Sequence, residues 1–333
     1  MSQEINWLQG RTILVTGGTG YLAANLVRRL RPLNCRIVRL SRTLAHGTEA
    51  PDGMAQVTEF FGDVREKATW EQLTGAPDFI LHLAAQTSVY TAGKDPVADW
   101  QANVLPMLHL LELCRVRGWR PGLVFAGSAT QYGLAEKMPV DDATADHPVT
   151  VYDVHKLAAE AHLRLAVGEG RVHGATLRLA NVYGPGPAGR TADRGILNQM
   201  VRRALRGEAI TLYGDGAQVR DYVYVDDVVE AFLAAARRVD QLQGGHYVIG
   251  TGTGHTLAAA FRLVAERVER LTGRRVAVDS VEPPANLSPI EQRNFVADSS
   301  RFRAATGWAP RVRLEEGIDR AVAFFRELEA SSK

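Results

Sequence analysis

The feature that most limits the possible folds is an alternation of short apolar runs with amphipathic helical stretches through the first half of the chain. Strands separated by helices form βαβ units, in which parallel strands are joined by right-handed crossovers. Buried parallel strands are apolar over nearly their whole length, and these runs fit that description. We expect strands over residues 12–16, 36–40, 79–83 and 123–126, with helices over 21–30, 98–117 and 152–167.

This pattern predicts an α/β fold, a Rossmann-type doubly wound parallel sheet, in residues 1–180. After residue 180 the pattern loosens, and no Ser/Gly-rich linker marks a boundary. We expect residues 181–333 to form mainly a smaller C-terminal α/β lobe, with some segments returning to the Rossmann domain. Its expected strands cover 209–213 and 221–225, and its expected helices cover 195–206, 226–237 and 256–271.

Composition excludes several classes of protein. The chain has 333 residues, 23% of them charged and 46% hydrophobic, with a formal net charge of +2. No basic stripe accompanies a reading element, so nucleic acid is not an expected partner. The two cysteines, Cys35 and Cys114, suggest neither a disulfide scaffold nor a metal site. Neither a signal peptide nor an apolar stretch of ~20 residues is visible, so we expect no membrane partner and a cytoplasmic location.

A glycine-rich turn follows the first expected strand and opens the first expected helix. Its spacing is Gly17-x-x-Gly20-x-x-Ala23. Glycines there allow a tight turn and a close approach of the backbone to a pyrophosphate at a helix N-terminus. The turn therefore predicts dinucleotide binding, and the alternative is a β-to-α turn without a ligand.

The end of the second expected strand bears on the choice of dinucleotide. An acidic residue there binds the ribose 2′-hydroxyl of NAD, whereas this chain has Ser41 and Arg42. A hydroxyl and a guanidinium suit the 2′-phosphate of NADP. NADP(H) is therefore the favoured cofactor and NAD a possible one; the alternative is that Arg42 is an ordinary exposed arginine in a polar loop.

Three residues in the middle of the chain suit proton transfer at a hydroxyl. Tyr152 and Lys156 are four apart, hence on one face of a helix, and Ser128 lies upstream. Tyrosine has a reference pKa of about 10, and a neighbouring ammonium favours the phenolate. Ser128 can hydrogen-bond the same substrate oxygen. The bland alternative is a core tyrosine beside a solvated lysine.

Taken together, the motifs resemble those of the extended short-chain dehydrogenases/reductases, particularly those acting on nucleotide-diphosphate sugars. The resemblance covers nearly the whole chain and its motifs occur in the expected order. They lie at residues 15–20, 62–64, 82–86, 127–133, 152–156, 177–186, 213–222 and 225–228.

The resemblance implies a role for each matching position. Ser128, Tyr152 and Lys156 would be catalytic, and no metal is implied. The cofactor contacts would come from Gly17, Thr19, Gly20, Tyr21, Leu22, Ser41, Arg42, Asp63, Val64, Leu83, Ala84, Ala85, Tyr152 and Lys156. The C-terminal lobe would bind the substrate, a nucleotide-diphosphate sugar, and the substrate contacts would come from Gln86, Thr87, Ser88, Thr130, Asn181, Tyr213, Arg220 and Arg293.

The chain departs from relatives that eliminate water from the sugar. Those relatives carry an acidic pair after the serine or threonine position, where this chain has Ala129 and Thr130. The preferred hypothesis is an NADPH-dependent reductase of a 4-keto (or 3-keto) sugar nucleotide. The alternative is a nucleotide-sugar 4-epimerase with tightly bound NAD(P). A more remote alternative is a non-catalytic dinucleotide sensor.

Two further expectations concern the helix that carries Tyr152. His155 replaces the small residue usual before the lysine, and we expect it on the helix exterior or at an interface. The resemblance also implies a homodimer through a four-helix bundle, which the small residues Ala158, Ala159 and Ala161 would allow by close helix approach. The alternative is that these alanines pack within one chain.

Overall fold

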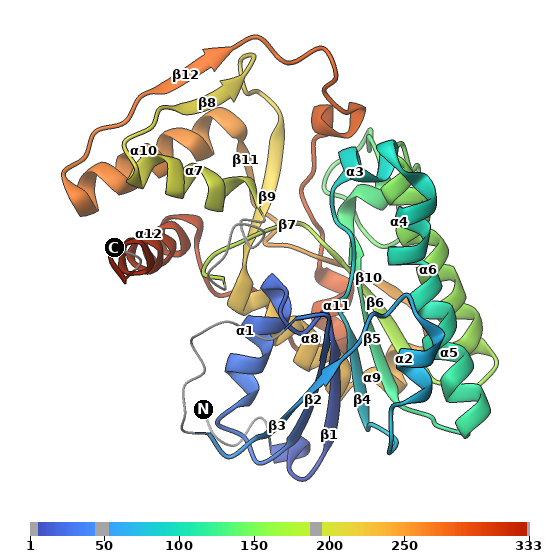
Figure 1. Cartoon of the computed structure of the whole chain (residues 1–333). Helices are drawn as coiled ribbons and strands as arrows, with labels where there is room; N and C mark the ends of the chain where they lie inside the picture. Colours follow the sequence, from blue (N-terminus) through green and yellow to red (C-terminus); the bar gives the residue numbers. More distant parts are fainter. Residues whose placement is uncertain (1–5, 44–52, 187–194, 332–333) are drawn as a thin grey trace.

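A parallel sheet of seven strands lies at the centre of the larger lobe (Figure 1). The structure is a computed structural model, and it describes residues 6–43, 53–186 and 195–331. The strand order is β10-β6-β5-β4-β1-β2-β3, which is the Rossmann order with one strand added. The strands are β1 Thr12–Thr16, β2 Arg36–Ser41, β3 Gln56–Phe61, β4 Phe79–His82, β5 Gly122–Ser128, β6 His173–Leu179 and β10 His246–Ile249. The α/β, Rossmann-type prediction is confirmed.

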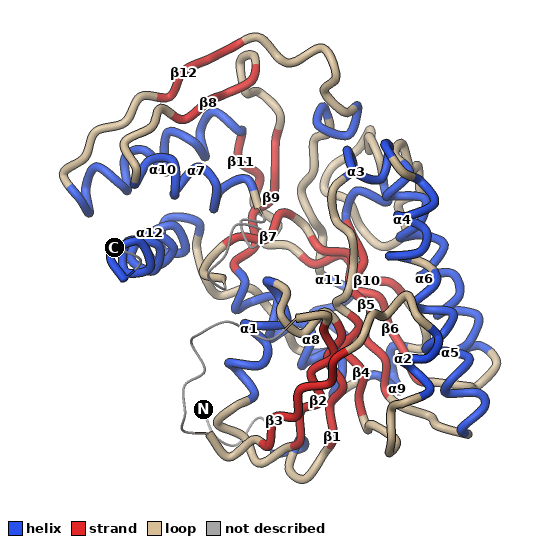
Figure 2. Tube along the Cα trace, in the orientation of Figure 1, coloured by secondary structure: helices blue, strands red, loops and turns tan. Residues whose placement is uncertain are grey.

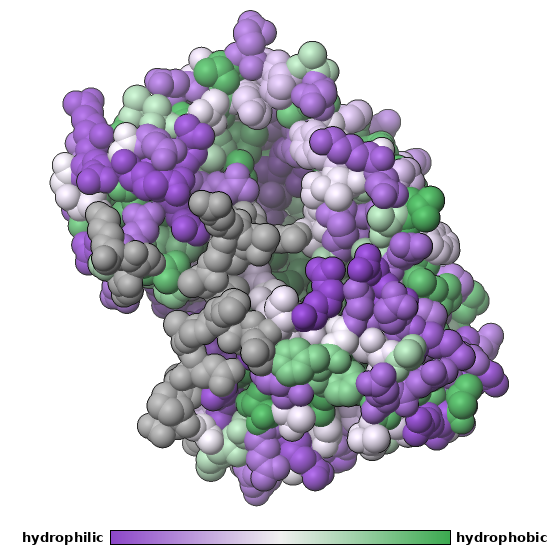
Figure 3. Space-filling model, viewed as in Figure 1, coloured by the Kyte–Doolittle hydropathy of each residue, from purple (hydrophilic) through white to green (hydrophobic). Residues whose placement is uncertain are grey.

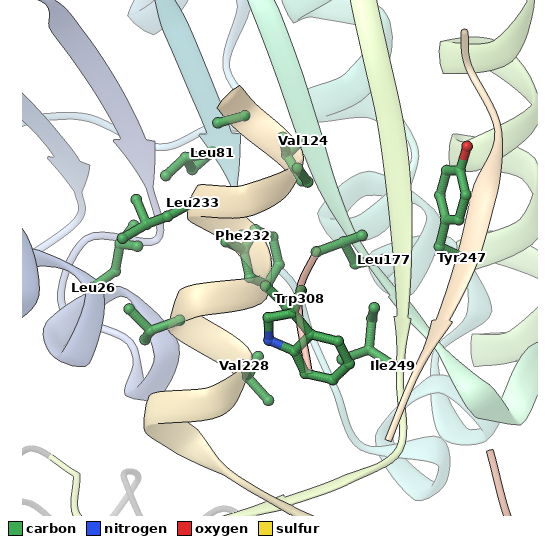
Figure 4. Packing of buried hydrophobic residues seen from close by; sticks show 14 of the residues in the cluster. Leu26, Leu81, Val124, Leu177, Val228, Phe232, Leu233, Tyr247, Ile249 and Trp308 are labelled. Atoms are coloured by element: carbon green, nitrogen blue, oxygen red, sulfur yellow. The ribbon is translucent and has the colours of Figure 1, made fainter. Parts of the chain in front are cut away.

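Helices cover both faces of this sheet, so the sheet is doubly wound. Successive strand residues point to opposite faces, and each face has its own apolar core. On one face, Leu26 of α1 (Tyr21–Leu30) and Phe232 of α8 (Val225–Arg237) pack over the strands (Figure 4). The opposite face is covered by α2 Lys67–Glu71, α5 Leu105–Arg117 and α6 Val151–Gly168.

The sequence pattern did not indicate three of the seven strands: β3, β6 and β10. β3 is an edge strand whose residues are exposed or half-buried, so its pattern is not an apolar run. β6 carries the fully buried Arg178, whose charge is compensated by carboxylates from elsewhere in the fold. In β3 and β6 the position of the strand in the fold, rather than an apolar sequence pattern, determines the strand conformation.

The single helix expected over residues 98–117 is wrong. The structure has two helices, α4 (Pro96–Asn103) and α5 (Leu105–Arg117), which meet at Val104. Pro106 lies in the first turn of α5. Its missing N–H and its ring prevent a continuous helix, but both are tolerated at a helix start.

The smaller lobe, whose helices and strands lie apart from the seven-stranded sheet in Figure 2, has a separate apolar core. Its helices, α7 Ile196–Leu205, α10 Leu257–Thr272 and α12 Leu314–Ser331, enclose residues such as Val201, Phe261 and Ile318. A parallel pair, β8 (Ile210–Tyr213) with β12 (Val278–Val281), adjoins them. A three-stranded sheet completes the lobe with β7 Asn181–Tyr183, β9 Val219–Tyr224 and β11 Gly254–Thr256.

The chain passes between the two lobes repeatedly. After β9 in the smaller lobe, α8 and β10 return to the seven-stranded sheet, and β11 and α10 lie again in the smaller lobe. Later, α11 (Ser300–Thr306) packs against β10, and the Trp308 indole donates a hydrogen bond to the Asp227 carbonyl at 2.9 Å. The division at residue 180 stays a prediction. Within the described ranges, no helix combines the length and apolar character needed to cross a bilayer.

Candidate active site

The expected cofactor residues lie along one edge of the sheet. They follow the carboxyl ends of β1, β2, β3 and β4, and Ser128 ends β5. These five strands are consecutive neighbours in the sheet. Ligands of open α/β sheets bind outside the carboxyl ends of the strands. In Figure 3 the surface is hollowed between the two lobes, next to the residues drawn in grey.

The glycine-rich turn has the geometry that its sequence predicts. Gly17 has φ +66°, and a Cβ there would lie 2.8 Å from the Ala84 Cα, so only glycine fits. The Gly20 N–H donates to the Gly17 carbonyl at 2.7 Å and tightens the turn. No side chain caps α1 at Gly20, which leaves first-turn N–H groups available to an anion. The turn therefore fits a dinucleotide pyrophosphate.

A buried threonine ties this turn to the loop after β4. Thr16 Oγ1 accepts hydrogen bonds from the N–H groups of Leu83 and Ala84, both at 3.1 Å. Its own proton is then directed to His82 Nδ1, 2.9 Å away, so His82 carries its proton on Nε2. Burial, with the Lys156 charge as a smaller cause, lowers the pKa of His82 to about 3. His82 is therefore a neutral structural residue.

Tyr21 and Leu22 stand in the first turn of α1, where they can offer backbone N–H groups. The Tyr21 side chain is directed away from the turn, because its hydroxyl donates to the Gly184 carbonyl at 3.0 Å. Gly186 lies against the same ring, so a Cβ there would lie 2.5 Å from Tyr21 Cδ2. Tyr21 thus connects the cofactor turn with the segment that leads into the smaller lobe.

At the adenosine end, the two residues after β2 differ in accessibility. The Ser41 hydroxyl is buried and donates to the Thr43 carbonyl at 2.7 Å, while Arg42 is exposed. Asp63 pairs with Arg65 through several hydrogen bonds, the shortest 2.6 Å. These bonds, with a smaller contribution from the Arg42 charge, hold the pKa of Asp63 below its ordinary value. Arg42 therefore lies close to the expected adenine pocket.

Sequence reasoning assigned no role to a second arginine in this region. Arg39 of β2 is buried and forms a 2.6 Å ion pair with Glu59, its partner on β3. Its aliphatic stem fills the space above Gly18, where a Cβ would be 2.0 Å from Arg39 Cγ. The sequence did not indicate a role for Arg39, because it is a single polar residue within the apolar run of β2.

Ser128 is held in place by its own turn. Its Oγ lies 2.8 Å from Thr130 Oγ1, and its N–H donates to Gln131 Oε1 at 2.8 Å. The Gln131 amide in turn donates to Glu160 Oε2 on α6 at 3.0 Å. Thr130 also hydrogen-bonds Asp153 in the first turn of α6. These contacts fix the serine relative to the helix that carries the other catalytic candidates.

Tyr152 and Lys156 lie on the buried face of α6, so the solvated-lysine alternative is wrong. A capping box between Thr150 and Asp153 starts the helix. Tyr152 is 7% and Lys156 is 2% exposed. The Lys156 ammonium lies 4.0 Å from the ring centroid of Phe125, three residues before Ser128 on β5. Burial lowers the pKa of Lys156 to about 7, although Asp99 and Glu160 oppose the shift.

Of the two positions expected for His155, the helix exterior or an interface, the exterior is wrong, because the residue lies at the contact between α6 and α4. His155 is 9% exposed, and its Nδ1 lies 2.6 Å from Asp99 Oδ2 on α4. The edge of the Trp100 ring packs against it, with the ring centroids 5.3 Å apart. A histidine can be buried there because α4 supplies a carboxylate at the same level of the helix pair.

The expected substrate residues of the smaller lobe lie together. Arg220 of β9 is 2% exposed and donates to the carbonyl oxygens of Glu291, at 2.8 Å, and Arg293. Arg293 Nη2 lies 3.4 Å from Asn181 Oδ1. The pKa of each arginine is lowered, chiefly by burial; for Arg220 the second cause is Arg293, and its pKa falls to about 10. Two neighbouring cations, Arg220 buried and Arg293 half-buried, suit an anionic ligand.

Two buried polar atoms in this cluster have no hydrogen-bond partner among the residues that the structure describes. They are Arg293 Nε and the Tyr222 hydroxyl. The Arg220 and Arg293 charges both act on Tyr222, which places its ring beside them. Orphaned buried donors are uncommon and suggest a ligand or solvent partner. The sequence offered no signal for Tyr222 beyond its place in a motif.

The other expected substrate residues are less tightly grouped. The Gln86 amide donates to Asp99 Oδ1 at 2.7 Å and to the Ser88 carbonyl at 2.8 Å, so its side chain is directed into the protein. Ser88 caps α3 (Val89–Lys94), and Thr87 is exposed. Tyr213, at the end of β8, is 46% exposed. The loop from 186 to 196, expected to shape the sugar site, lies mostly outside the described residues.

No group of three or more His, Cys, Asp or Glu side chains is placed to hold a metal in the parts of the chain that the structure describes. Cys35 and Cys114 are buried free thiols. Ser128, Tyr152 and Lys156 lie at the edge of the sheet that also carries the dinucleotide turn, and their side chains suit proton transfer at a hydroxyl.

This fold and site define a class of protein: a dinucleotide-dependent short-chain dehydrogenase/reductase of the extended type. The family model described as the NAD dependent epimerase/dehydratase family matches residues 13–250, and the chain belongs to that family. It is therefore an NAD(P)-dependent enzyme, and the family resemblance drawn from the motifs is confirmed.

Three comparisons indicate the range of this similarity. The UDP-glucose 4-epimerase of Mycolicibacterium smegmatis is 31% identical, over 94% of this chain and 98% of its own length. The crystal structure of Thermus thermophilus UDP-glucose 4-epimerase complexed with NAD is 33% identical, with a TM-score of 0.75 over 95% of this chain and 99% of that one. The GDP-6-deoxy-D-mannose reductase of Pseudomonas aeruginosa is 28% identical, over 92% and 94%.

Proposed function

We propose that the protein is an NADPH-dependent reductase of a keto-sugar nucleotide, with a 4-keto (or 3-keto) sugar as substrate. The observation that supports this proposal is the pair of residues at the end of β2, Ser41 and Arg42. There Arg42 is exposed and its charge acts on Asp63, beside which we expect the adenine to bind, and the position that suits the ribose 2′-hydroxyl of NAD holds Ser41 rather than an acid. A preference for NADPH suits a net reduction, because NADPH gives up a hydride and leaves as oxidised NADP.

The residues of the chain have distinct tasks in this reaction. A bound nicotinamide dinucleotide supplies the hydride. Ser128 hydrogen-bonds the carbonyl oxygen, and Tyr152 donates the proton that the new alkoxide takes up. The Lys156 ammonium, held over the Phe125 ring, stabilises the phenolate left on Tyr152. Arg220, Arg293 and Tyr222 bind the diphosphate, since planar guanidinium groups match its oxygens.

A nucleotide-sugar 4-epimerase is the second candidate, and the similarity to two UDP-glucose 4-epimerases favours it. Purified enzyme is mixed with NADPH and a 4-keto sugar nucleotide, and absorbance at the nicotinamide band is followed. A reductase oxidises one NADPH per sugar. An epimerase instead equilibrates two sugar epimers without net cofactor change and retains its dinucleotide through purification, and that result would overturn the reductase proposal.

Replacement of Arg42 by alanine tests the cofactor assignment. A charge-assisted hydrogen bond contributes about 1.5–3 kcal/mol, so Arg42→Ala is expected to weaken NADPH binding roughly 10- to 100-fold and to leave NADH binding unchanged. Fluorescence titration of both nucleotides measures this. Arg36→Ala is the matched control, since Arg36 is exposed at the opposite end of the same strand. Equal losses for NADPH and NADH in Arg42→Ala would contradict the assignment.

We also propose a homodimer through the outer faces of α5 and α6. Val154 and Leu165 of α6 are 48% and 60% exposed, and Ala158 and Ala161 lie between them on the same face. We expect sedimentation equilibrium to give twice the 36.4 kDa of the chain. Leu165→Glu should give a monomer, whereas Leu134→Glu, at a leucine that is 45% exposed and belongs to neither helix, should not. A monomeric wild-type protein at micromolar concentration would exclude the dimer.

A further inference from the structure

A buried carboxylate lies beside the catalytic candidates and has no part in the reaction described above. Asp99 of α4 is 2% exposed. Its Oδ1 accepts hydrogen bonds from Gln86 at 2.7 Å and Asn103 at 2.9 Å, and its Oδ2 lies 2.6 Å from His155 Nδ1. Three donors around one carboxylate satisfy most of its acceptor positions. The Asp99 side chain is therefore held in one position by groups from α4, α6 and the loop after β4.

The residue that follows the Asp99-bound histidine on α6 is Lys156, whose ammonium is buried. Burial of an ammonium without compensation is costly. Lys156 has the Phe125 ring on one side, and Asp99 is the leading group that favours its charged form. Glu160 on α6 also favours the charged form of Lys156. In turn, the Lys156 charge helps to keep His82 of β4 neutral.

Asp99 and Glu160 differ in how far their charges are already compensated. Arg178 donates to both oxygens of Glu160, at 2.6 and 2.9 Å, so most of that negative charge is neutralised. The partners of Asp99 are two neutral amides and one histidine. No lysine or arginine is among these partners, so within the described residues the charge of Asp99 is less compensated than that of Glu160.

Asp99 also holds the loop after β4. The Gln86 amide that binds Asp99 also donates to the Ser88 carbonyl, while Gln86 Oε1 accepts from the Ser88 N–H at 2.5 Å. Asn103 donates to the Gln86 carbonyl at 3.0 Å. One carboxylate thus positions both the lysine side of the site and the loop that faces the cofactor edge.

We propose that Asp99, oriented by His155, is a positioning residue that keeps Lys156 protonated and so keeps Tyr152 competent for proton transfer; the second part rests on the proposed function. The sequence carries both halves of this pair, Asp99 and His155, but on separate helices, so only their contact in the fold reveals it. Asp99 touches neither substrate nor cofactor and acts through Lys156.

A titration of Lys156 in the cofactor-free protein tests the first part directly. The chain contains only five lysines, so a protein labelled at the lysine side chains gives five NMR signals, and Lys156→Met identifies the one of interest. Asp99→Asn keeps the shape and removes the charge. We expect the Lys156 midpoint to fall by roughly one pH unit, because a nearby opposite charge shifts a titration by about this much or more. An unchanged midpoint would overturn the proposal.

The matched control is Asp95→Asn, which removes a carboxylate from the exposed N-cap of the same helix. Asparagine caps as well as aspartate, so α4 should remain intact and the Lys156 midpoint unchanged. An equal shift in both variants would indicate a general effect of net charge and would also overturn the proposal. If Asp99→Asn does not fold, Asp99→Glu replaces it. Glutamate retains the charge, so the wild-type midpoint should persist, and a fall in the midpoint contradicts the idea.

The pH dependence of kcat tests the second part. In Asp99→Asn the alkaline fall in kcat should begin about one pH unit earlier than in wild type, with activity near pH 6 least affected. A uniform loss at every pH would indicate a merely structural role and would overturn the catalytic part. The NMR titration needs no substrate. If no keto-sugar nucleotide is reduced but the midpoint shifts, the proposed function fails while the Asp99–Lys156 coupling stands.

Discussion

Tyr152→Phe is expected to lower kcat by roughly 10²- to 10⁴-fold, which is the usual contribution of a positioned general acid. The variant keeps the ring in its buried place on α6 and removes only the hydroxyl, so the free energy of unfolding should change little. Nucleotide affinity should also be nearly unchanged. Single-turnover measurements of nicotinamide oxidation, with circular dichroism of the folded protein, separate these effects.

Tyr132→Phe provides a matched control for this experiment. Tyr132 lies in the short helix η2 (Ala129–Tyr132) after Ser128 and is 1% exposed. Its hydroxyl has no hydrogen-bond partner among the described residues, so its removal should leave kcat near the wild-type value. If Tyr152→Phe retained full turnover, Tyr152 would not be the proton donor. If both variants lost activity equally, the loss would reflect packing near Ser128.

The second large effect is expected on stability, from Arg178→Met. Arg178 is 0% exposed and forms ion pairs with Glu160, at 2.6 Å, and Asp146, at 2.5 Å, while its guanidinium lies 4.6 Å from the centroid of the Tyr132 ring. Removal of one partner from a buried ion pair leaves an uncompensated charge and costs about 3–5 kcal/mol. Urea unfolding of the variant should show this loss.

Arg262→Met is the control for that loss. Arg262 is exposed on α10, outside the proposed dimer interface, and a surface substitution away from special features changes stability by about 0.5 kcal/mol or less. The Arg178 variant should also lose activity at temperatures where it is still folded, because Glu160 binds Gln131 and Gln131 holds Ser128. Similar stability for the two variants would show that the buried ion pairs contribute little.

Strand and helix positions were predictable where local sequence decides them. The first strand was expected over residues 12–16, and β1 spans Thr12–Thr16, because a buried central strand must be apolar throughout. The helix expected over 152–167 is α6, Val151–Gly168, because a capping box and a long amphipathic pattern define it. The break between α4 and α5 at Val104 was not predicted, although Pro106, two residues later, favours a helix start over a helix interior.

The candidate site divides in the same way. The residues at the carboxyl ends of strands were predictable because a parallel sheet gathers them at one edge. Contacts between distant segments were not. The burial of His155 depends on Asp99 from another helix, and the neighbourhood of Arg220 and Arg293 depends on how residues 290–293 lie over β9. Sequence periodicity predicts which face of a helix is buried, but it does not predict which residues of other segments pack against that face.

The repeated passage of the chain between the lobes has a mechanical consequence. Several connecting segments of the backbone join the two lobes, so the lobes do not move about a single hinge. A large rotation of one lobe against the other would require all the connecting segments to change conformation together. Proteolytic cleavage of one connecting segment would not separate the lobes. Neither lobe could have been added by fusing a complete domain to one end of the chain, because the sequence segments of the two lobes alternate along the chain.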